Sequence, residues 1–447
     1  MNLAPPVRRL GRFAPGFPRT APGKTGERTA SRTPARTRTG SVVQRERHQA
    51  DYVILVVVVA LSAIGILMVY SSSAIRGYLS ADADTFATVG PQIQWAILGI
   101  VAMAAMMKVD YRYLRLISVP LFGFAIFLLV IVLLPPIGPL HPIRVGGSAR
   151  WLQLGPLPAI HPAEVAKLAL VIYLAHWFAK RGTRIGSLWG GTVAFLIIVT
   201  PISFLVFREP DLGTTMVITM TAFTMFFVAG ADVVHFGVLM ASAFLALILA
   251  GLRGYQVDRI RAWLDPWSDK LGDGFHTIQG LLALGVGGVL GSGLGRSQVS
   301  VPNAFNDFVF AEVGQEFGLI GGFVVIVLFC TLAYSGIRIA LRAPDTFGAL
   351  LAAGITAWLC IQAFINIGVV VALFPITGIT LPFISAGGSS LIISFAAVGI
   401  LLSISRETIE KGTWNDDAIG DRRRGDGRAH LPGSGRGHVT PRPAGRA

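Results

Sequence analysis

The sequence has few charged residues and almost no cysteine. Only 14% of its 447 residues are charged, whereas 53% are hydrophobic, and its mean hydropathy is +0.64. Ordinary globular domains carry about a quarter charged residues, so this composition excludes a water-soluble globular protein and indicates an integral membrane protein. The two cysteines, Cys330 and Cys360, lie within apolar runs, which argues against a disulfide framework or a zinc centre.

The net charge of +14 does not indicate nucleic-acid binding, because the charge is unevenly distributed. Residues 1–50 hold eleven Arg and Lys against two Glu and are rich in Pro, Gly and Thr. We predict a disordered basic cytoplasmic tail here that is attracted to anionic lipid, and a second disordered tail over 406–447. The first apolar run begins only near Tyr52 and is long enough to cross a bilayer, so we expect no cleavable signal peptide.

Successive apolar runs predict an all-α fold, a bundle of about ten transmembrane helices over residues 51–405. Basic turns at 108–115, 180–184 and 338–342, together with both termini, are placed in the cytoplasm by the positive-inside rule. The longest loop, 252–306, then lies outside the cell membrane between spans seven and eight. The predicted spans are 51–73, 92–107, a third ending at 135–136, 161–178, 191–207, a sixth and a seventh between 213 and 251, an eighth beginning at 307, 347–373 and a tenth ending by 404.

Four segments that carry the motifs of interest fall on the outer side of this topology. They are 145–164, 208–213, 253–312 and 375–390. We therefore expect one extracytoplasmic site that is built from all four segments.

The third segment carries carboxylates into an apolar helix. Asp307 stands where the eighth span begins, and Glu312 and Glu316 follow on one helix face. Acids inside a membrane are costly and indicate function. Asp307 could serve only as a helix N-cap, a place that Asn306 could also fill. Alternatively, burial raises its pKa and suits it to act as a general base.

Counter-charges for these acids lie on the fourth span. Glu164 and Lys167 are i,i+3 neighbours and could form a salt bridge with each other, but we predict that Lys167 pairs across to the eighth span. His161 and Glu164 also have this spacing, but no second such pair exists to complete a metal cage. Arg150, in an otherwise apolar loop, is a candidate phosphate ligand.

Two further clusters leave alternatives open. Arg208, Glu209 and Asp211 lie in the short link after span five, where Asp211 either caps span six or acts in the site. A Gly-Gly-Ser-Ser sequence ending at Ser389 and Ser390 opens span ten. It could offer backbone N–H groups to an anion or serve close helix packing.

These motifs, in order along the chain, resemble the SEDS family of polytopic peptidoglycan glycosyltransferases (FtsW, RodA and SpoVE). The sequence HPAEVAK ending at Lys167 resembles the family's QPSExxK, and EPDLGT over 209–214 resembles QPDLGT. PITGITLPFISAGGSS over 375–390 resembles PVTGxPLPFxSYGGSS, and NDFVFA around Asp307 resembles TDFIFA at the family's essential aspartate. The departures include Phe305-Asn306 in place of His-Thr, Gln315 for the first Glu of GEE and Ala386 for Tyr.

The resemblance implies a glycosyltransferase of the bacterial cell membrane that polymerises lipid II at the outer face and releases undecaprenyl pyrophosphate, in cell division or cell-shape maintenance. Asp307 takes the position of the catalytic base. As substrate-binding residues we expect Arg150, Glu164, Lys167, Arg208, Asp211, Glu312, Glu316, Thr377, Ser389 and Ser390.

The implied partners are lipid II, the undecaprenyl-pyrophosphate-linked glycan, a class B penicillin-binding protein that acts as transpeptidase, and other divisome or elongasome proteins. Met68-Val-Tyr-Ser71 and the basic tail favour the FtsW division branch over RodA. A divalent cation (Mg²⁺ or Mn²⁺) could assist, but no ligand set can be read from the sequence. Two rivals are a lipid II flippase and a non-catalytic scaffold that recruits the transpeptidase. The inner halves of the spans carry almost no charge, which favours an enzyme over a flippase.

Overall fold

A computed structural model describes most of the chain between residues 51 and 407. All of the described residues belong to one compact unit, Glu46–Ala447. The predicted tails, 1–50 and 408–447, lie outside the described residues. The described ranges are 51–79, 85–136, 140–145, 148–155, 158–251, 255–272, 274–301 and 304–407.

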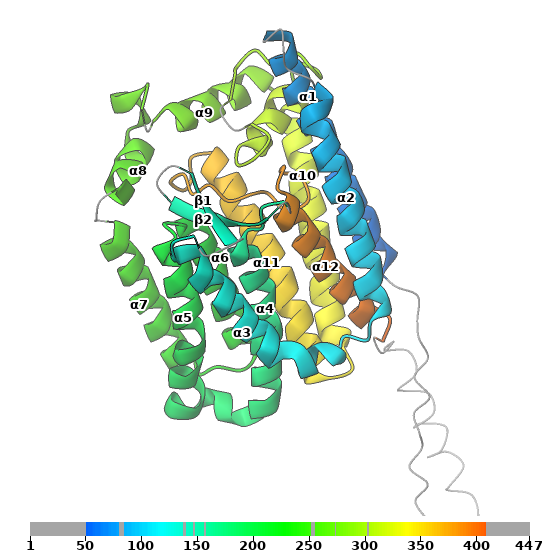
Figure 1. Ribbon diagram of the computed structural model, residues 1–447, viewed down its shortest axis with the longest axis vertical. Coiled ribbons are helices and arrows are strands. Elements are labelled where there is room, and N and C mark those ends of the chain that lie inside the picture. The colour runs from blue at the N-terminus through cyan, green and yellow to red at the C-terminus, as the bar shows by residue number, and fades with distance from the viewer. Residues whose placement is uncertain are drawn as a thin grey trace, which may run out of the picture. The chain divides into compact units, whose positions relative to one another are not determined.

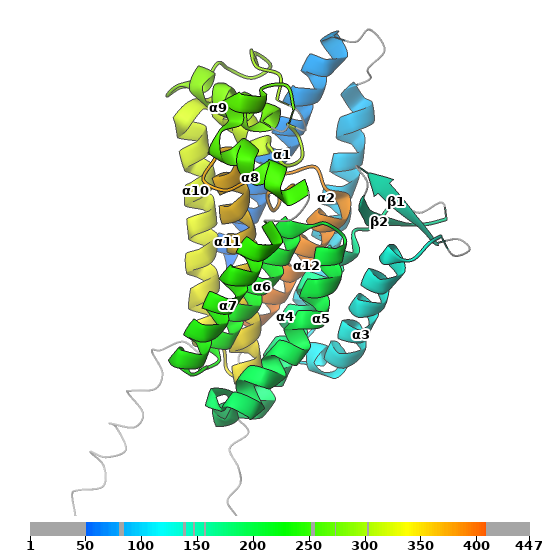
Figure 2. The same cartoon turned by 90° about the vertical axis from the view of Figure 1, so that its left-hand side faces the viewer.

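The described chain is almost entirely helical, as the composition predicts (Figures 1 and 2). Each predicted span coincides with one helix, and eight helices in the described ranges are long and apolar enough to cross a bilayer. The remaining two helices, α6 and α7, have shorter apolar stretches. The ten helices are α1 (Tyr52–Leu79), α2 (Thr85–Lys108), α3 (Tyr113–Leu133), α4 (Pro162–Arg181), α5 (Ala194–Arg208), α6 (Leu212–Val228), α7 (Val233–Gly251), α10 (Val309–Arg342), α11 (Thr346–Val370) and α12 (Gly388–Ser405). A 3-10 turn, η1 (Gly182–Gly186), and a π-helical turn, η2 (Leu188–Val193), precede α5.

The first and the last described helices end together at one side of the unit. The Asp51 N–H donates to the Ser405 hydroxyl (3.2 Å), and the Asp51 carboxylate forms an ion pair with Arg338 of α10. Three other elements lie at the opposite side: a β-hairpin (residues 140–154), α8 (Tyr255–Leu264) and α9 (Phe275–Gly287) (Figure 1). This arrangement fits an even number of crossings, as predicted.

Helices α4, α11 and α12 form the centre of the bundle. Buried residues make up 67% of the apolar window of α4, 67% of that of α11 and 78% of that of α12, against 28% for α2, α3 and α10. The outer helices therefore expose most of their apolar side chains, as expected for helices that face lipid. Any polar side chain on a central helix must find its partner inside the protein.

A two-stranded antiparallel hairpin follows α3, which the sequence analysis did not predict. Strand β1 (Leu140–Val145) pairs with β2 (Ser148–Leu154), and Ile143 lies opposite Trp151. Backbone bonds between Leu152 and Ile160, of 2.8 and 2.9 Å, tie β2 to the chain just before α4. The hairpin thereby fixes Arg150 next to the start of α4.

The loop between α7 and α10 contains more structure than we predicted. It holds α8 (Tyr255–Leu264), the 3-10 turn η3 (Pro266–Asp269) and α9 (Phe275–Gly287). Helix α10 starts two residues after Asp307 and breaks at Gly318, where φ is 67° and ψ is −162°. The loop after α9 bonds the backbone groups that the break frees: Leu319 N–H donates to the Gly288 carbonyl (2.9 Å), and Gly293 N–H to the Glu316 carbonyl (3.0 Å).

Candidate active site

Four helices begin around one cavity of ≈ 260 Å³, on the side of the unit opposite the described chain ends. They are α4, α6, α10 and α12. Helix N-termini carry partial positive charge, so a cavity that several of them open into favours an anionic ligand. All four predicted segments contribute to the lining, as the topology required. The predicted site residues in the lining are Arg150, Glu164, Lys167, Asp211, Asp307, Ser389 and Ser390.

Asp307 lines the cavity with a carboxylate that has no hydrogen-bond partner in the described part of the chain. The capping alternative is wrong, because the N-cap of α10 is Phe308 and no side chain caps that helix. The position of the Asp307 backbone is fixed from behind: the Asn366 amide of α11 donates to the Asp307 carbonyl (2.8 Å) and to the Ile379 carbonyl (2.7 Å). The carboxylate is therefore held in place and left available for a ligand.

The surroundings of Asp307 tune its acidity. Burial, and then the negative charge of Asp211, raise its pKa to about 6, while Arg150 and Arg259 act in the opposite direction. A Cβ at Gly378 would lie 3.5 Å from the Asp307 Oδ2 atom and 4.0 Å from the Arg150 Nη1 atom, so both groups border this glycine. A carboxylate with a pKa near 6 is largely ionised at neutral pH and still basic enough to accept a proton.

Arg150 links the hairpin to the turn between α5 and α6. Its Nε and Nη2 groups donate to the carbonyls of Glu209 (3.2 Å) and Pro210 (2.6 Å). Glu209 itself is fully buried, and neither of its carboxylate oxygens has a partner. Burial, and then the charge of Asp211, raise the pKa of Glu209 to about 9, so this acid is neutral at pH 7. The positive charge of Arg150 thus stays available to the cavity.

Asp211 fulfils the capping role that the sequence left open, and its role in substrate binding stays a prediction. It is the N-cap of α6, since its carboxylate accepts bonds from the Thr214 N–H (3.0 Å) and hydroxyl (2.8 Å). It also lines the cavity, where its Oδ2 atom lies 3.8 Å from the Nε2 atom of His161. The sequence analysis did not assign His161 to the site.

The predicted pairing of Lys167 with the eighth span is wrong. The Lys167 ammonium donates to Glu164 one turn away (2.8 Å) and to the Gln362 side-chain oxygen on α11 (2.6 Å). Both charged side chains are buried, with 3% and 9% of their surface exposed. The i,i+3 salt bridge satisfies the charges locally, so no carboxylate from α10 is needed. Gln362 and Asn366 were missed by the sequence analysis, although two buried amides at i,i+4 in an apolar helix are a readable signal.

The start of α12 serves packing and the cavity at once. A Cβ at Gly388 would lie 2.4 Å from the Trp95 ring, so the second glycine permits close contact with α2. The Ser389 hydroxyl accepts from the His161 N–H (3.2 Å), and the Ser390 hydroxyl lies 3.2 Å from that of Thr380. The packing explanation is therefore confirmed, and the anion-binding explanation stays a prediction.

Glu312 and Glu316 lie in the first turns of α10, outside the cavity lining, with 4% and 1% exposure. One oxygen of Glu316 accepts from the Gly295 N–H (3.2 Å) and from the Ser297 hydroxyl (3.1 Å), and the Ser71 hydroxyl of α1 also donates to it. Glu316 thus joins α1, α10 and the preceding loop. Its predicted contact with substrate stays a prediction, as does that of Glu312.

Two other predicted residues also lie outside the lining. Arg208 is exposed at the end of α5. Thr377 is buried, and a Cβ added at Gly213 would lie 2.8 Å from the Cβ of Thr377. Their substrate-binding roles stay predictions. In the described residues no group of three or more His, Cys, Asp or Glu is arranged to hold a metal ion, so the divalent cation has no assigned ligands.

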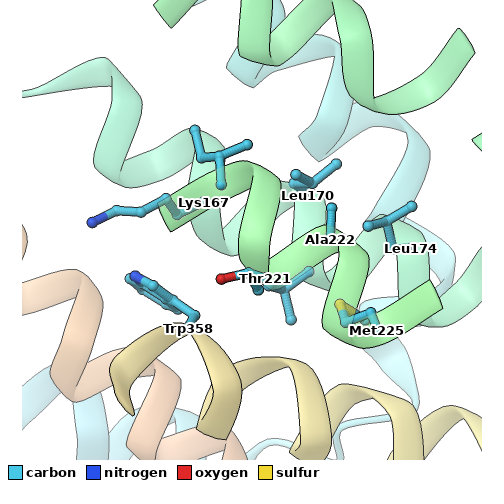
Figure 3. A pocket seen from close by; sticks show the side chains of 9 residues that line it. Lys167, Leu170, Leu174, Thr221, Ala222, Met225 and Trp358 are labelled. Atoms are coloured by element: carbon cyan, nitrogen blue, oxygen red, sulfur yellow. The ribbon is translucent and has the colours of Figure 1, made fainter. Parts of the chain in front are cut away.

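The space next to the cavity, beyond Lys167, is lined mostly by apolar side chains. Directly beyond Lys167, side chains of α4, α6 and α11 leave no room for a water molecule (Figure 3). The Lys167 ammonium lies 5.2 Å from the ring centroid of Trp358, and Leu170, Thr221 and Met225 fill the space beside them. The polar cavity therefore has an apolar, closely packed floor.

Residues 51–410 match the model of the FtsW/RodA/SpoVE family of cell cycle proteins. The chain belongs to this family. Stage V sporulation protein E of Bacillus subtilis (strain 168) is 42% identical over 362 residues, covering 80% of this chain and 97% of that protein. A probable peptidoglycan glycosyltransferase FtsW of Geobacter metallireducens is 38% identical over 374 residues, covering 83% and 97%.

A solved structure confirms the fold of the FtsW/RodA/SpoVE family for this chain. The solved structure is described as the structural coordination of polymerization and crosslinking by a peptidoglycan synthase complex. One of its chains aligns with this protein with a TM-score of 0.65 at 27% identity. The alignment covers 80% of this chain and 98% of the other. The resemblance inferred from the motifs is thus confirmed, and the protein is a bacterial multi-pass membrane protein with a helical bundle.

Proposed function

We propose that this protein is a peptidoglycan glycosyltransferase that polymerises glycan strands from lipid II at the outer face of the cell membrane. The observation that carries the proposal is Asp307. It presents an unpartnered carboxylate, with a pKa of about 6, to a polar cavity where Arg150 and four helix N-termini supply positive potential. The names of the relatives support the same activity.

In the proposed reaction Asp307 acts as general base. The C4 hydroxyl of the lipid II sugar attacks the anomeric carbon of the growing strand, and its proton passes to the Asp307 carboxylate. A new C–O bond forms as the bond from the anomeric carbon to the pyrophosphate oxygen breaks. The electron pair of that bond leaves with undecaprenyl pyrophosphate, and Asp307 later returns its proton to solvent.

The leaving group gains negative charge, which Arg150 and the start of α12 are placed to stabilise. Arg150 is held by two main-chain carbonyls rather than by a carboxylate, so its charge is not cancelled by a direct partner. The start of α12 adds backbone N–H groups beside Ser389 and Ser390. Lys167 contributes less than we expected from the sequence, because Glu164 already neutralises it.

The packed floor of the cavity favours an enzyme over a lipid II flippase. A flippase must carry the charged headgroup of lipid II across the bundle, so polar or charged side chains are expected along the whole path. The layer of Leu170, Thr221, Met225 and Trp358 offers no polar path below Lys167 (Figure 3). Lipid II would thus enter and leave on one side.

We further propose that the partner is a class B penicillin-binding protein, within the divisome. The solved relative from a peptidoglycan synthase complex supports such a partner, and the sporulation and FtsW relatives support the division branch over the elongasome. A divalent cation, Mg²⁺ or Mn²⁺, would supply charge neutralisation at the leaving pyrophosphate. Loss of polymer on chelation, restored by adding back one of these ions, would support that role.

The decisive experiment measures glycan polymer on gels after purified full-length protein is given lipid II. We expect polymer from the native protein and from Asp258→Asn, which removes an exposed carboxylate on α8, but none from Asp307→Asn. Unchanged polymer in Asp307→Asn would refute the assignment of the base. Absence of polymer from folded native protein, alone and with its transpeptidase, would favour the scaffold.

A further inference from the structure

His161 is a titratable side chain of the cavity that the proposed reaction does not yet use. It is the N-cap residue of α4, and only 12% of its side chain is exposed. The ring packs edge-on against Trp151 with centroids 5.1 Å apart, and its Nδ1 atom is enclosed without a partner. The ring nitrogen that can meet a ligand is therefore Nε2, which lies 3.8 Å from the Asp211 carboxylate.

The residue type at this position gives the chain a titratable group that the related motif lacks. HPAEVAK has histidine where the QPSExxK motif has glutamine. Both side chains can donate a hydrogen bond, but only imidazole can gain a proton near neutral pH. The position borders the same cavity as Asp307 and Arg150.

The charges that face His161 come from three elements. Asp211 at the start of α6 and Glu164 on α4 favour the charged imidazole, whereas Lys167 on α4 and Arg150 on β2 oppose it. Burial has the largest effect and lowers the pKa of His161. In the free protein the imidazole is therefore neutral at pH 7, and an anion placed beside Nε2 would favour the charged form.

We propose that His161 binds a phosphate oxygen of the lipid-linked substrate through Nε2, and that it takes up a proton when the substrate binds. The inference rests on the proposed function for the identity of the substrate. His161 is a positioning residue in this scheme: it orients the pyrophosphate and exchanges no proton with the sugar. In the bound state both ring nitrogens carry a proton, and the Nε2–H group lies between the Asp211 carboxylate and the phosphate.

The coupling makes substrate affinity depend on pH with a defined sign. Lipid II should bind more tightly as the pH falls through the pKa of His161, because the charged imidazole is then already present. An opposite charge at this range moves a pKa by about one unit or more, so the affinity should change by about tenfold across the pH range in which His161 titrates.

The test measures lipid II binding by titration calorimetry to the full-length Asp307→Asn protein, in pairs of buffers with different ionisation enthalpies. This background stops turnover and removes the Asp307 titration. In this background, the additional substitution His161→Gln keeps a hydrogen-bond donor at position 161 but removes the titratable group. Added His235→Gln is the matched control, because His235 lies 3.7 Å from Asp232 in a similar pair at the start of α7, away from the cavity.

We expect proton uptake on binding in Asp307→Asn, and the same uptake when His235→Gln is added. Addition of His161→Gln should abolish both the uptake and the roughly tenfold pH dependence of the dissociation constant. Undiminished uptake with His161→Gln would overturn the proposal. If His161→Gln does not fold, absence of uptake in Asp307→Asn alone overturns it. Absence of polymer from the native protein would instead refute the proposed function, since binding is measured without turnover.

Discussion

Replacing Asp307 with asparagine should abolish polymerisation and also stabilise the protein at alkaline pH. The folded protein raises the pKa of this carboxyl from 3.8 to about 6, mainly by burial. Folding therefore disfavours the ionised form. Asparagine has the same shape and no charge, so it removes this unfavourable contribution and keeps the bonds that the backbone makes with Asn366.

The size and the pH range of the effect follow from the two pKa values. A shift of about two units corresponds to about 3 kcal/mol as an upper value. The group binds protons more tightly in the folded state than in the unfolded state. Its destabilising effect is therefore complete above the folded pKa of about 6, declines as the pH falls from there, and is absent below the unfolded value of 3.8.

Thermal unfolding of the purified proteins in detergent tests this directly. Asp307→Asn should unfold at a higher temperature than the native protein at about pH 8, and the difference should vanish at about pH 4. Asp258→Asn should show neither effect. A carboxylate that capped α10 or joined a salt bridge would give the opposite sign, because its removal would destabilise the protein. A lower or unchanged unfolding temperature at pH 8 would refute the reasoning.

Three further predictions concern the surroundings of this carboxylate. Arg150→Gln should move the acid limb of the polymerisation rate to higher pH, because the guanidinium lowers the pKa of the base; an unmoved limb would contradict this. Lys167→Met should lower the free energy of unfolding by about 3–5 kcal/mol, and adding Glu164→Gln should restore part of it in a double-mutant cycle. Gly291→Ala should destabilise more than Gly293→Ala in thermal unfolding. Both have positive φ, but a Cβ at Gly291 would lie 2.1 Å from a main-chain oxygen of α10, against 3.7 Å to the nearest atom at Gly293.

The sequence predicted which segments meet, because topology alone decides it. The number of apolar runs gives the number of membrane crossings, and the basic turns give the orientation of each crossing. Every polar motif then falls at the extracytoplasmic end of the bundle. Seven of the eleven predicted site residues line the cavity for this reason. Crossing counts carry no information on rotation about a helix axis. Glu316 consequently faces the preceding loop and α1 rather than the cavity, and Glu312 also lies outside the cavity lining.

The sequence could not decide the partner of Lys167, because two arrangements satisfied its charge. The local salt bridge prevails since Glu164 and Lys167 share a helix face at no cost in tertiary geometry. The Gln362 side chain of α11 completes the pair by accepting a second bond from the ammonium. The hairpin and α9 were missed for another reason: two strands of 6 and 7 residues and a helix of 13 residues are too short for their periodicity to be recognised within the connections between spans.

Main-chain bonds explain how the site tolerates an unusual sequence beside its acid. The Ala386 N–H donates to the Phe305 carbonyl (2.7 Å), and the Ser385 hydroxyl donates to the Asn306 carbonyl (2.6 Å). Together with the Asn366 amide on the Asp307 carbonyl, these bonds hold the main-chain carbonyls of three successive residues. Phenylalanine and asparagine can therefore stand in place of histidine and threonine without moving the acid. The same bonds hold Asp307 in a buried position that disfavours its ionisation, so the carboxylate keeps its basicity. The main-chain hydrogen bonds stabilise the folded segment, whereas the ionised carboxylate destabilises it.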